Sequence, residues 1–283
     1  MRPSAYYRAA ARKCDVRRIL QLSDLLEFLG TLTSASVFSY SAKSMKLNNI
    51  LIAASSICLL VSFWNRNDLP GNIDYVPAIA AAPAQTATRQ PPFAVTFNEI
   101  EFLVEPEYKY DITGMVVSYR HHDPDYSRMH RLAKDHLNML DVCVVWGDNT
   151  RVPLHRIKFW NGLFTCNAST RDRTAWEAFD MQQLSNNHLL SDDDFVRRQV
   201  KAVNIGDQIR VRGYLVSYTG PAGKRGTSTT RADTGDGACE TLYIERFDIV
   251  APGLSYWKLS MYVSLALLLF SLGIHVRKPY RPY

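Results

Sequence analysis

The middle of the chain, where a nucleic-acid-binding domain would need a net positive charge, has none. The 283 residues carry a formal net charge of +6. Residues 1–64 hold eight Lys or Arg and three Asp or Glu, and residues 256–283 hold four cations and no acid. The middle, residues 65–255, has 21 cations and 24 acids, a net charge of −3. Because a domain that faces phosphates carries the basic excess itself, nucleic acid is not expected among the partners.

Long apolar runs are also few. The hydrophobic fraction of 47% is ordinary for a globular chain and argues against a multi-span transporter. One run lies within residues 256–276, where a Tyr-Trp pair precedes an uncharged stretch and cations follow it. The other, residues 47–64 (LNNILIAASSICLLVSFW), is shorter and ends in Phe-Trp. Apolar segments with aromatic and basic flanks are typical of membrane spans, so both predict transmembrane helices in a lipid bilayer.

Two spans would leave both basic ends on one side of the membrane. The positive-inside rule makes that side cytoplasmic. This predicts a basic cytoplasmic or juxtamembrane segment at 1–46, a cytoplasmic tail at 277–283 and an extracytoplasmic domain at 93–250. Residues 22–40 leave an alternative, since they are fairly apolar but hold Asp24 and Glu27. A third span there would separate the basic ends, so we interpret the segment as a helix lying on the membrane.

The region between the spans predicts an α+β domain. Residues 65–92 are rich in Ala and Pro and predict an extended linker. Alternating or apolar runs predict strands at 93–97, 100–104, 110–119, 140–146, 157–166, 208–218 and 241–250. Helices are predicted at 127–137, 172–184 and 192–203. The last has acidic residues first and basic ones in its second turn, as the helix dipole favours.

Two of the predicted strands share one pattern. YDITGMVVSY (110–119) and QIRVRGYLVSY (208–218) each have a central glycine, Gly114 or Gly213, followed by apolar residues and Ser-Tyr. A glycine inside an alternating strand marks a bulge or a bend at a barrel corner. The turn Ile205-Gly206-Asp207 resembles the entry to a late strand of OB-type barrels. We therefore expect an OB-like barrel with helical insertions.

Three segments of the C-terminal half, SNNHLL (185–190), VNIGDQIRVRGYLVSY (203–218) and TSTTRADTGDGACE (227–240), resemble a group of uncharacterised bacterial membrane-anchored proteins. The resemblance implies a bacterial inner, or plasma, membrane with the domain periplasmic or extracellular. It implies no activity.

Three cysteines fall in the predicted domain: Cys143, Cys166 and Cys239. In an oxidising compartment three thiols allow one disulfide and one free cysteine. Cys143 lies in an apolar strand (DVCVVW) and is expected to pack as a small hydrophobic side chain. Cys166 and Cys239 adjoin loops, so the predicted disulfide is Cys166–Cys239.

An enzymatic alternative assigns Cys166 to catalysis. Phe164-Thr165-Cys166 with a following arginine resembles the Thr-Cys…Arg nucleophile segment of sortases, which are membrane-anchored β-barrels. The resemblance implies Cys166 as nucleophile, Arg171 as its cationic partner, and His121 or the adjacent histidine as base. The order of elements departs from the sortase pattern, because the Gly-Asp strand comes after the cysteine in this chain.

Histidines in one polar loop suggest a metal site only loosely. His121, His122 and His130 lie near several aspartates and could offer ligands to zinc or manganese. Their spacing fits no standard motif, and the segment 233–237 lacks the regular oxygen ligands of a calcium loop. We therefore predict neither a metal nor another cofactor.

The long loop 219–237, rich in Gly, Ser and Thr, is the predicted contact surface, together with the strand before it. Long loops between strands are often functional. The residues proposed for binding are Arg210, Arg212, Tyr214, Tyr218, Lys224, Arg225 and Arg231. The favoured function is a non-catalytic, membrane-anchored module that recruits another envelope or membrane protein. The alternatives are the cysteine-dependent enzyme and a metal-binding protein.

Overall fold

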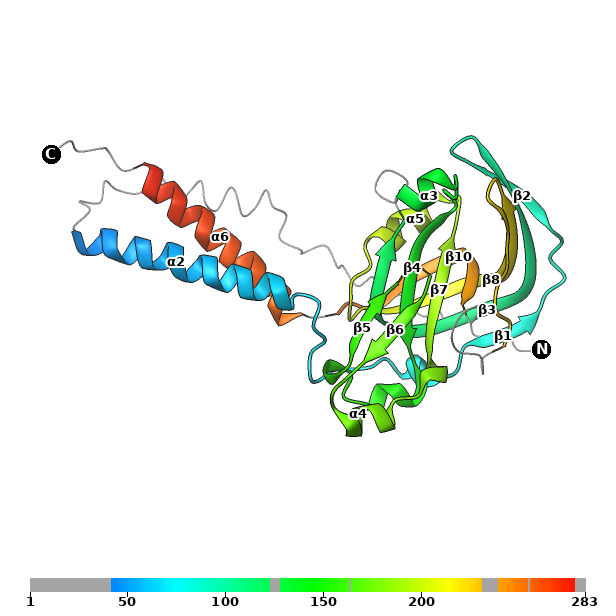
Figure 1. Cartoon of the computed structure of the whole chain (residues 1–283), viewed down its shortest axis with the longest axis horizontal. Helices are drawn as coiled ribbons and strands as arrows, with labels where there is room; N and C mark the ends of the chain where they lie inside the picture. Colours follow the sequence, from blue (N-terminus) through cyan, green and yellow to red (C-terminus); the bar gives the residue numbers. More distant parts are fainter. Residues whose placement is uncertain (1–41, 123–127, 163, 231–238, 254, 278–283) are drawn as a thin grey trace, which may run out of the picture. The chain divides into compact units, whose positions relative to one another are not determined.

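The computed structural model describes residues 42–122, 128–162, 164–230, 239–253 and 255–277. The expectation for residues 22–40 and the predicted contact Arg231 lie outside these ranges. Two long helices, α2 (Ala42–Asn65) and α6 (Tyr256–Val276), come before and after a β-rich region in the chain (Figure 1).

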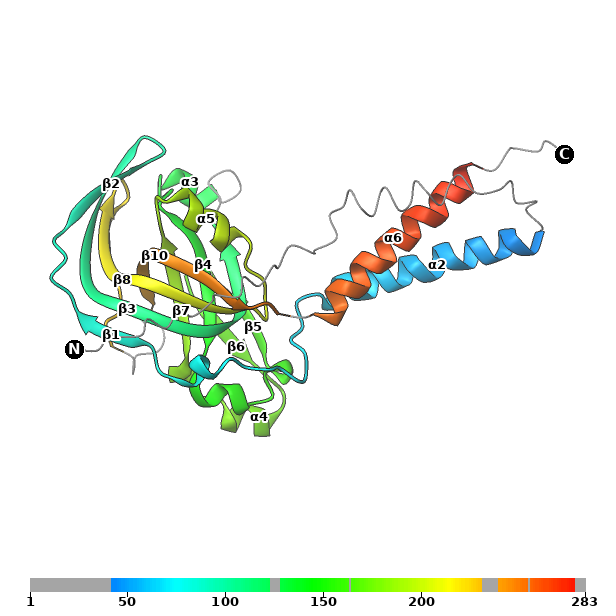
Figure 2. The ribbon, with the colours of Figure 1, turned by 180° about the vertical axis from the view of Figure 1, so that it is seen from behind.

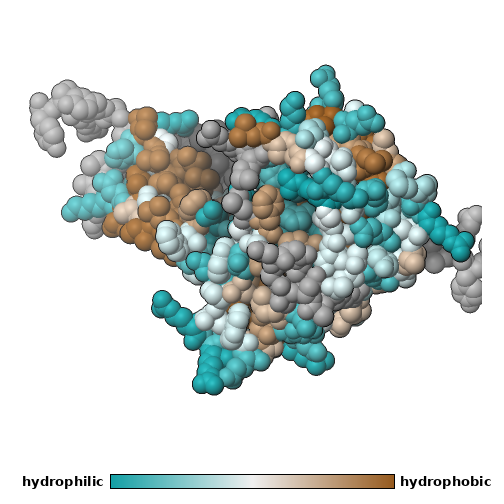
Figure 3. Space-filling view, turned by 45° about the vertical axis from the view of Figure 1, so that its right-hand side comes forward, coloured by the Kyte–Doolittle hydropathy of each residue, from teal (hydrophilic) through white to brown (hydrophobic). Residues whose placement is uncertain are grey.

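Both long helices, Lys46–Asn65 within α2 and Tyr256–Val276, are long and apolar enough to cross a membrane. Most of their apolar side chains are exposed, and they form the large brown area at the left of Figure 3. Their buried residues include serines. The Ser62 hydroxyl donates to the Ser260 hydroxyl at 2.9 Å, and Cys58 Sγ lies 3.4 Å from the same oxygen. Small polar residues of this kind let two apolar helices approach closely.

The β-rich region contains one large mixed sheet and one small antiparallel sheet, so the fold is α+β (Figures 1 and 2). The strands of the large sheet are β1 (Ala84–Ala87), β2 (Phe93–Phe97), β3 (Ile100–His121), β4 (Asn138–Val145), β7 (Leu184–Leu190), β8 (Gln208–Gly220), β9 (Gly223–Arg225) and β10 (Glu240–Ala251). The small sheet pairs β5 (Lys158–Asn161) with β6 (Cys166–Ser169).

The strand pairings form a closed circuit. β3 pairs with β8 along residues 103–115 and with β4 along residues 115–121. From β4 the pairing continues to β7, then to β10 and β8, and so returns to β3. β3 is long enough to pair with β8 along its first part and with β4 along its last part. In the circuit, β7 and β10 are parallel and the other pairs are antiparallel.

The glycines predicted to mark bends lie at tight contacts. The register between β8 and β10 shifts after the pair Gly213 and Ile244. A Cβ atom at Gly213 would collide with the backbone carbonyl oxygen of Tyr243. At Gly114 a Cβ would lie 3.0 Å from the Val144 Cβ. The irregularity beside Gly213 lies in the partner strand β10, where Glu245 is the extra residue, and Gly213 itself marks a close backbone approach.

Residues 65–92 pack against the domain over much of their length. Ile79 is 1% exposed within the main core, and β1 pairs with β3. The Gln208 side chain accepts from the backbone N–H of Val76 at 2.8 Å and donates to the carbonyl of Asp74 at 2.7 Å. The extended linker predicted from composition is therefore wrong here, because one buried apolar side chain and these backbone contacts outweigh the Ala/Pro bias.

Shorter helices occur where the sequence predicted them: α3 (Arg128–Leu132), α4 (Arg173–Ala178) and α5 (Asp194–Lys201). Asp193 caps α5 by accepting the backbone N–H groups of Phe195 and Val196. The single strand predicted at 157–166 is not observed: β5 occupies its first half, and the range reaches only the first residue of β6. The two strands predicted at 100–104 and 110–119 are one continuous β3. β7 was not predicted, since its Asn-Asn-His sequence disfavours a strand.

Candidate functional site

A cavity of about 490 Å³ opens where β7, β8, β9 and the start of β10 meet. Its wall includes a thiol, an imidazole, a guanidinium, a phenol, a phenyl ring and a hydroxyl. These groups belong, in that order, to Cys239, His188, Arg225, Tyr218, Phe164 and Thr227. The volume lies within the range of small-molecule sites in proteins.

Behind the cavity, a buried carboxylate holds the imidazole. Asp141 of β4 and His188 of β7 are directly paired across the two strands, so their side chains share one face of the sheet. Asp141 Oδ1 lies 2.5 Å from His188 Nδ1. The carboxylate is 1% exposed and the imidazole 13%. Every residue of β4 is buried, which explains why Asp141 has so little contact with solvent.

The electrostatics of this pair favour its charged form. Burial works against ionisation of both groups. The close approach of His122 and the hydrogen bond from His188 nevertheless hold the pKa of Asp141 well below its usual range. Burial also lowers the pKa of His188, but hydrogen bonds to Asp141 and Cys239 outweigh it and raise that pKa to about 10. His188 is therefore protonated at neutral pH.

The free thiol of Cys239 completes the array. Cys239 directly precedes β10, whose parallel register with β7 places it beside Asn186. Its Sγ donates to the Phe164 carbonyl at 3.1 Å and accepts from Asn186 Nδ2 at 3.5 Å, it lines the same cavity as His188, and its interaction with His188 contributes to the raised pKa of that imidazole. Carboxylate, imidazole and thiol thus follow one another in the order used by thiol enzymes, in which the acid orients the base and the base contacts the nucleophile.

A second pair of histidines lies on the other side of Asp141. His122 Nε2 is 2.7 Å from Asp141 Oδ2, and its ring stacks on that of His130 at 3.8 Å between centroids. His130 Nδ1 is in turn 3.6 Å from Asp135 Oδ2. Burial, with His122 nearby, lowers the pKa of His130. Both rings are at most 4% exposed, so they belong to the support of the site and not to the cavity wall.

Asp135 connects this layer to the opposite side of the cavity. It is 2% exposed and accepts from the Tyr218 hydroxyl, which lies 3.0 Å from both carboxylate oxygens. Burial and this carboxylate raise the pKa of Tyr218 far above its usual value. Arg225 Nε lies 3.4 Å from Asp135 Oδ2, and the guanidinium carbon is 5.6 Å from the centre of the Phe164 ring.

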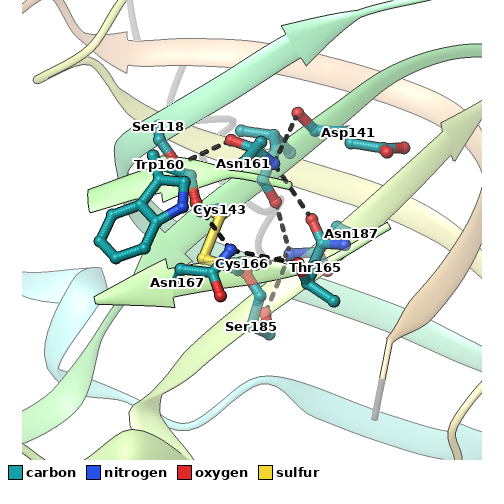
Figure 4. The surroundings of a disulfide bond; sticks show 12 residues. Ser118, Asp141, Cys143, Trp160, Asn161, Thr165, Cys166, Asn167, Ser185 and Asn187 are labelled. Atoms are coloured by element: carbon teal, nitrogen blue, oxygen red, sulfur yellow. Dashed lines mark hydrogen bonds between the residues drawn. A yellow bond between two sulfur atoms is a disulfide. The ribbon is translucent and has the colours of Figure 1, made fainter. Parts of the chain in front are cut away.

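A disulfide joins Cys143 of β4 to Cys166 of β6 (Figure 4). The predicted Cys166–Cys239 bond is therefore wrong, and Cys239 is free. The sequence suggested the wrong pair because it does not show that the β5–β6 sheet lies beside β4. With its sulfur in a disulfide, Cys166 is not the nucleophile that the resemblance to sortases implied.

An amide network links the strands around the disulfide to the thiol. Ser118 donates to Asn161 Oδ1 at 2.7 Å (Figure 4). Asn161 Nδ2 donates to Asn186 Oδ1 at 3.4 Å. Asn186 then contacts Cys239 and also donates to the Phe164 carbonyl at 3.0 Å. The disulfide and these amides together hold the segment with Phe164 against the thiol.

The other residues named for the enzymatic and metal-binding alternatives are not brought together in one site. His121 is exposed with its ring against Tyr119, and Arg171 is exposed; neither lines the cavity. His122 and His130 contact each other in a stack instead of converging with His121 on a point. Within the ranges that the structure describes, no group of three or more His, Cys, Asp or Glu is arranged to hold a metal ion.

Most cations of the predicted binding surface already have acidic partners. These ion pairs are Arg210–Asp111 at 2.6 Å, Arg212–Asp248 at 2.9 Å and Lys224–Glu105 at 2.6 Å. Tyr214 is half-buried. Tyr218 is 3% exposed, so its assignment to the surface is wrong. The second half of β8 passes into a smaller core cluster with Phe102 and Val104, which covers that ring.

Sequence reasoning missed Asp141, His188 and Asn186. A signal was present, since a charged or polar residue in an otherwise apolar strand must find a partner when it is buried. Asp141 begins the run DVCVVW, and Asn186 and His188 lie in SNNHLL.

Comparison of the chain with protein-family models, with curated proteins and with solved structures found no match in any of the three.

Proposed function

We propose that the domain is a thiol-dependent acyl-transfer enzyme in which Cys239 is the nucleophile. The observation that carries the proposal is the array Asp141–His188–Cys239 at the wall of a cavity. A thiol is a useful nucleophile when a neighbouring imidazolium stabilises its thiolate. A carboxylate buried behind the imidazole fixes the ring orientation and its charge.

In the proposed reaction, the Cys239 thiolate attacks the carbonyl carbon of an acyl donor. The Sγ–C bond forms, the bond to the leaving group breaks, and His188 gives its proton to the leaving group. Water or an acceptor amine then attacks the thioester while His188 takes up a proton. The Sγ–C bond breaks and the thiolate is restored.

A binding module alone gives no reason for this cluster. Asp135, Asp141, His122 and His130 are all at most 4% exposed. Burying charged groups is unfavourable unless they are closely paired, and such arrangements are concentrated at functional sites. The free thiol also lies at the one end of the array that reaches the cavity.

We further propose that the strand circuit is an OB-like barrel. Its five strands follow the order β3–β4–β7–β10–β8, with a parallel pair β7–β10. α5 lies between β7 and β8 in the chain. This order is that of a closed Greek-key barrel, in which the first strand pairs with the fourth. The barrel accounts for the long β3 and for the bulge beside Gly213.

For the cellular setting we propose a bacterial inner membrane with both termini cytoplasmic and the domain outside. Three features support it: two apolar helices, basic excess confined to the ends, and a disulfide in the domain. Disulfides persist in oxidising compartments and are rare in the cytosol.

Alkylation of Cys239 by iodoacetamide tests the proposed chemistry without knowledge of the substrate. The full chain in detergent is treated at pH 6 and pH 8, and modification is followed on the Cys239 peptide by mass spectrometry. The rates should agree within about threefold, whereas an ordinary thiol slows by roughly two orders of magnitude over this range.

His188→Gln should restore the steep pH dependence of an ordinary thiol, and the matched exposed-site variant His155→Gln should not. The alternative function, a non-catalytic module that recruits another envelope protein, predicts ordinary behaviour of Cys239 in the unmodified protein. A steep pH profile there, unchanged by His188→Gln, would reject the enzyme and favour that module.

A further inference from the structure

The cavity wall presents cations, whereas the carboxylates of the cluster lie behind it. Arg225 and His188 line the cavity with side chains 34% and 13% exposed. Asp135 and Asp141, which hold these two cations, are 2% and 1% exposed and do not line it. No Asp or Glu is found among the described residues of the wall. Among the described residues of the wall, the charged groups that a ligand can meet are therefore cationic.

Arg225 is oriented in a way that leaves much of its guanidinium for a ligand. Its Nε faces Asp135 Oδ2 at 3.4 Å, and its carbon lies over the Phe164 ring. Within the described ranges, no hydrogen bond is found from either of its Nη nitrogens. A guanidinium fixed at one edge is well suited to bind a carboxylate with the other, because its planar donors match the two oxygens.

We propose that the cavity selects acyl donors that carry a carboxylate, and that Arg225 binds this carboxylate while Cys239 attacks the acyl carbon. The inference rests on the thiol chemistry proposed above and adds the substrate class to it. Arg225 acts here as a specificity residue: the carboxylate that it holds takes no part in bond breaking. The cavity volume, about 490 Å³, accommodates a small acyl compound with both groups.

Lys224 provides a matched control for the charge of Arg225. It precedes Arg225 in β9, is 60% exposed, and pairs with Glu105 at 2.6 Å. It does not line the cavity. Replacing either residue by methionine removes one positive charge from the same short strand, so a general change in net charge affects both variants equally.

The probe pair is iodoacetate and iodoacetamide, which differ only in having a carboxylate or an amide. Both alkylate a thiolate in the same way: the Sγ–C bond forms, the C–I bond breaks and iodide leaves. The measurement is the ratio of the two rate constants at the Cys239 peptide of the full chain, at fixed pH and low salt. Iodoacetamide alone reports whether the thiol and His188 are still intact.

Arg225→Met should lower the ratio of iodoacetate to iodoacetamide rates about tenfold, equivalent to about 1.4 kcal/mol. Lys224→Met should leave the ratio unchanged, and Arg225→Lys should give an intermediate value because the charge remains without the planar donors. Raising the salt concentration should reduce the ratio more in the unmodified protein than in Arg225→Met, where His188 is the remaining cation of the wall that the structure describes.

Equal ratios in Arg225→Met and the unmodified protein would overturn the inference, as would an equal fall in Lys224→Met. If Arg225→Met alone destabilises the domain by leaving Asp135 unpaired, the double variant Asp135→Asn/Arg225→Met removes that charge and is judged by the same ratio. Failure of the thiol proposal appears differently: it gives an ordinary pH profile with iodoacetamide, whatever the ratio.

Discussion

Replacement of Asp141 by Asn should lower the pKa of His188 and so remove its charge from the mildly basic pH range, where the unmodified protein keeps it protonated. The amide keeps the shape of the side chain, and its oxygen can still accept a hydrogen bond from His188 Nδ1. In the unmodified protein that nitrogen lies 2.5 Å from Asp141 Oδ1. What disappears is the negative charge that opposes the effect of burial. Since burial by itself lowers the pKa of a histidine, the remaining environment favours the neutral ring.

The magnitude follows from the contacts of His188. Its pKa is raised from 6.5 to about 10. One pKa unit corresponds to about 1.4 kcal/mol, so the surroundings favour the protonated ring by roughly 5 kcal/mol. Asp141 supplies the first of the favourable contributions and Cys239 the second. The substitution should therefore lower the pKa of His188 by at least about two units, to below about 8.

The assay is an NMR titration of the full chain in detergent with labelled histidine, with the His188 signal assigned by His188→Gln. The matched control is Asp148→Asn, which makes the same change at a carboxylate that is 74% exposed and forms an ion pair with Arg151. The control should leave the His188 curve unchanged. If His188 in Asp141→Asn still titrated near pH 10, the buried carboxylate would not be what charges the imidazole, and the proposed array would lose its basis.

Three further results are expected. In a Cys239→Ala background, the Asp141–His188 pair contributes its full stability below about pH 6.5, where a histidine is also protonated in the unfolded chain. This contribution should be lost as the pH rises toward the raised folded pKa, by up to about 1.4 kcal/mol per pH unit, and urea unfolding of Asp141→Asn in that background should show no such decline. Replacing Cys143 and Cys166 together by Ala should lower the free energy of unfolding by about 3 kcal/mol, given their sequence separation of 23; no change would mean that the bond does not form. Gly213→Ala should destabilise the domain by about 2–3 kcal/mol because its Cβ meets the Tyr243 carbonyl, and Gly71→Ala, whose nearest contact is 3.8 Å, should be nearly neutral by the same assay.

Several elements could be predicted because their signal is local. Residues 93–97 form β2 as predicted, and 208–218 and 241–250 fall inside β8 and β10, because alternating or β-branched side chains favour a strand whatever its partner. The two apolar helices follow equally directly from length and composition. The close backbone approach at Gly213 could be predicted because a glycine inside an alternating strand usually marks a bulge or such an approach.

The candidate site depended on contacts that no local pattern encodes. Cys143, Cys166 and Cys239 were all known from the sequence, but which two are joined depends on the packing of the β5–β6 sheet beside β4. His188 lies 47 residues from Asp141, and the pair exists because β4 and β7 are adjacent and in that register.

By itself, the sequence therefore determined where the chain is apolar, where it is basic and where strands can form, since these properties belong to short stretches. Only the tertiary structure decided which cysteine stays free and which histidine lies beside it. A slip of one residue between β4 and β7 would turn Asp141 and His188 to opposite faces of the sheet, so the array requires the whole set of strand pairings to be in place.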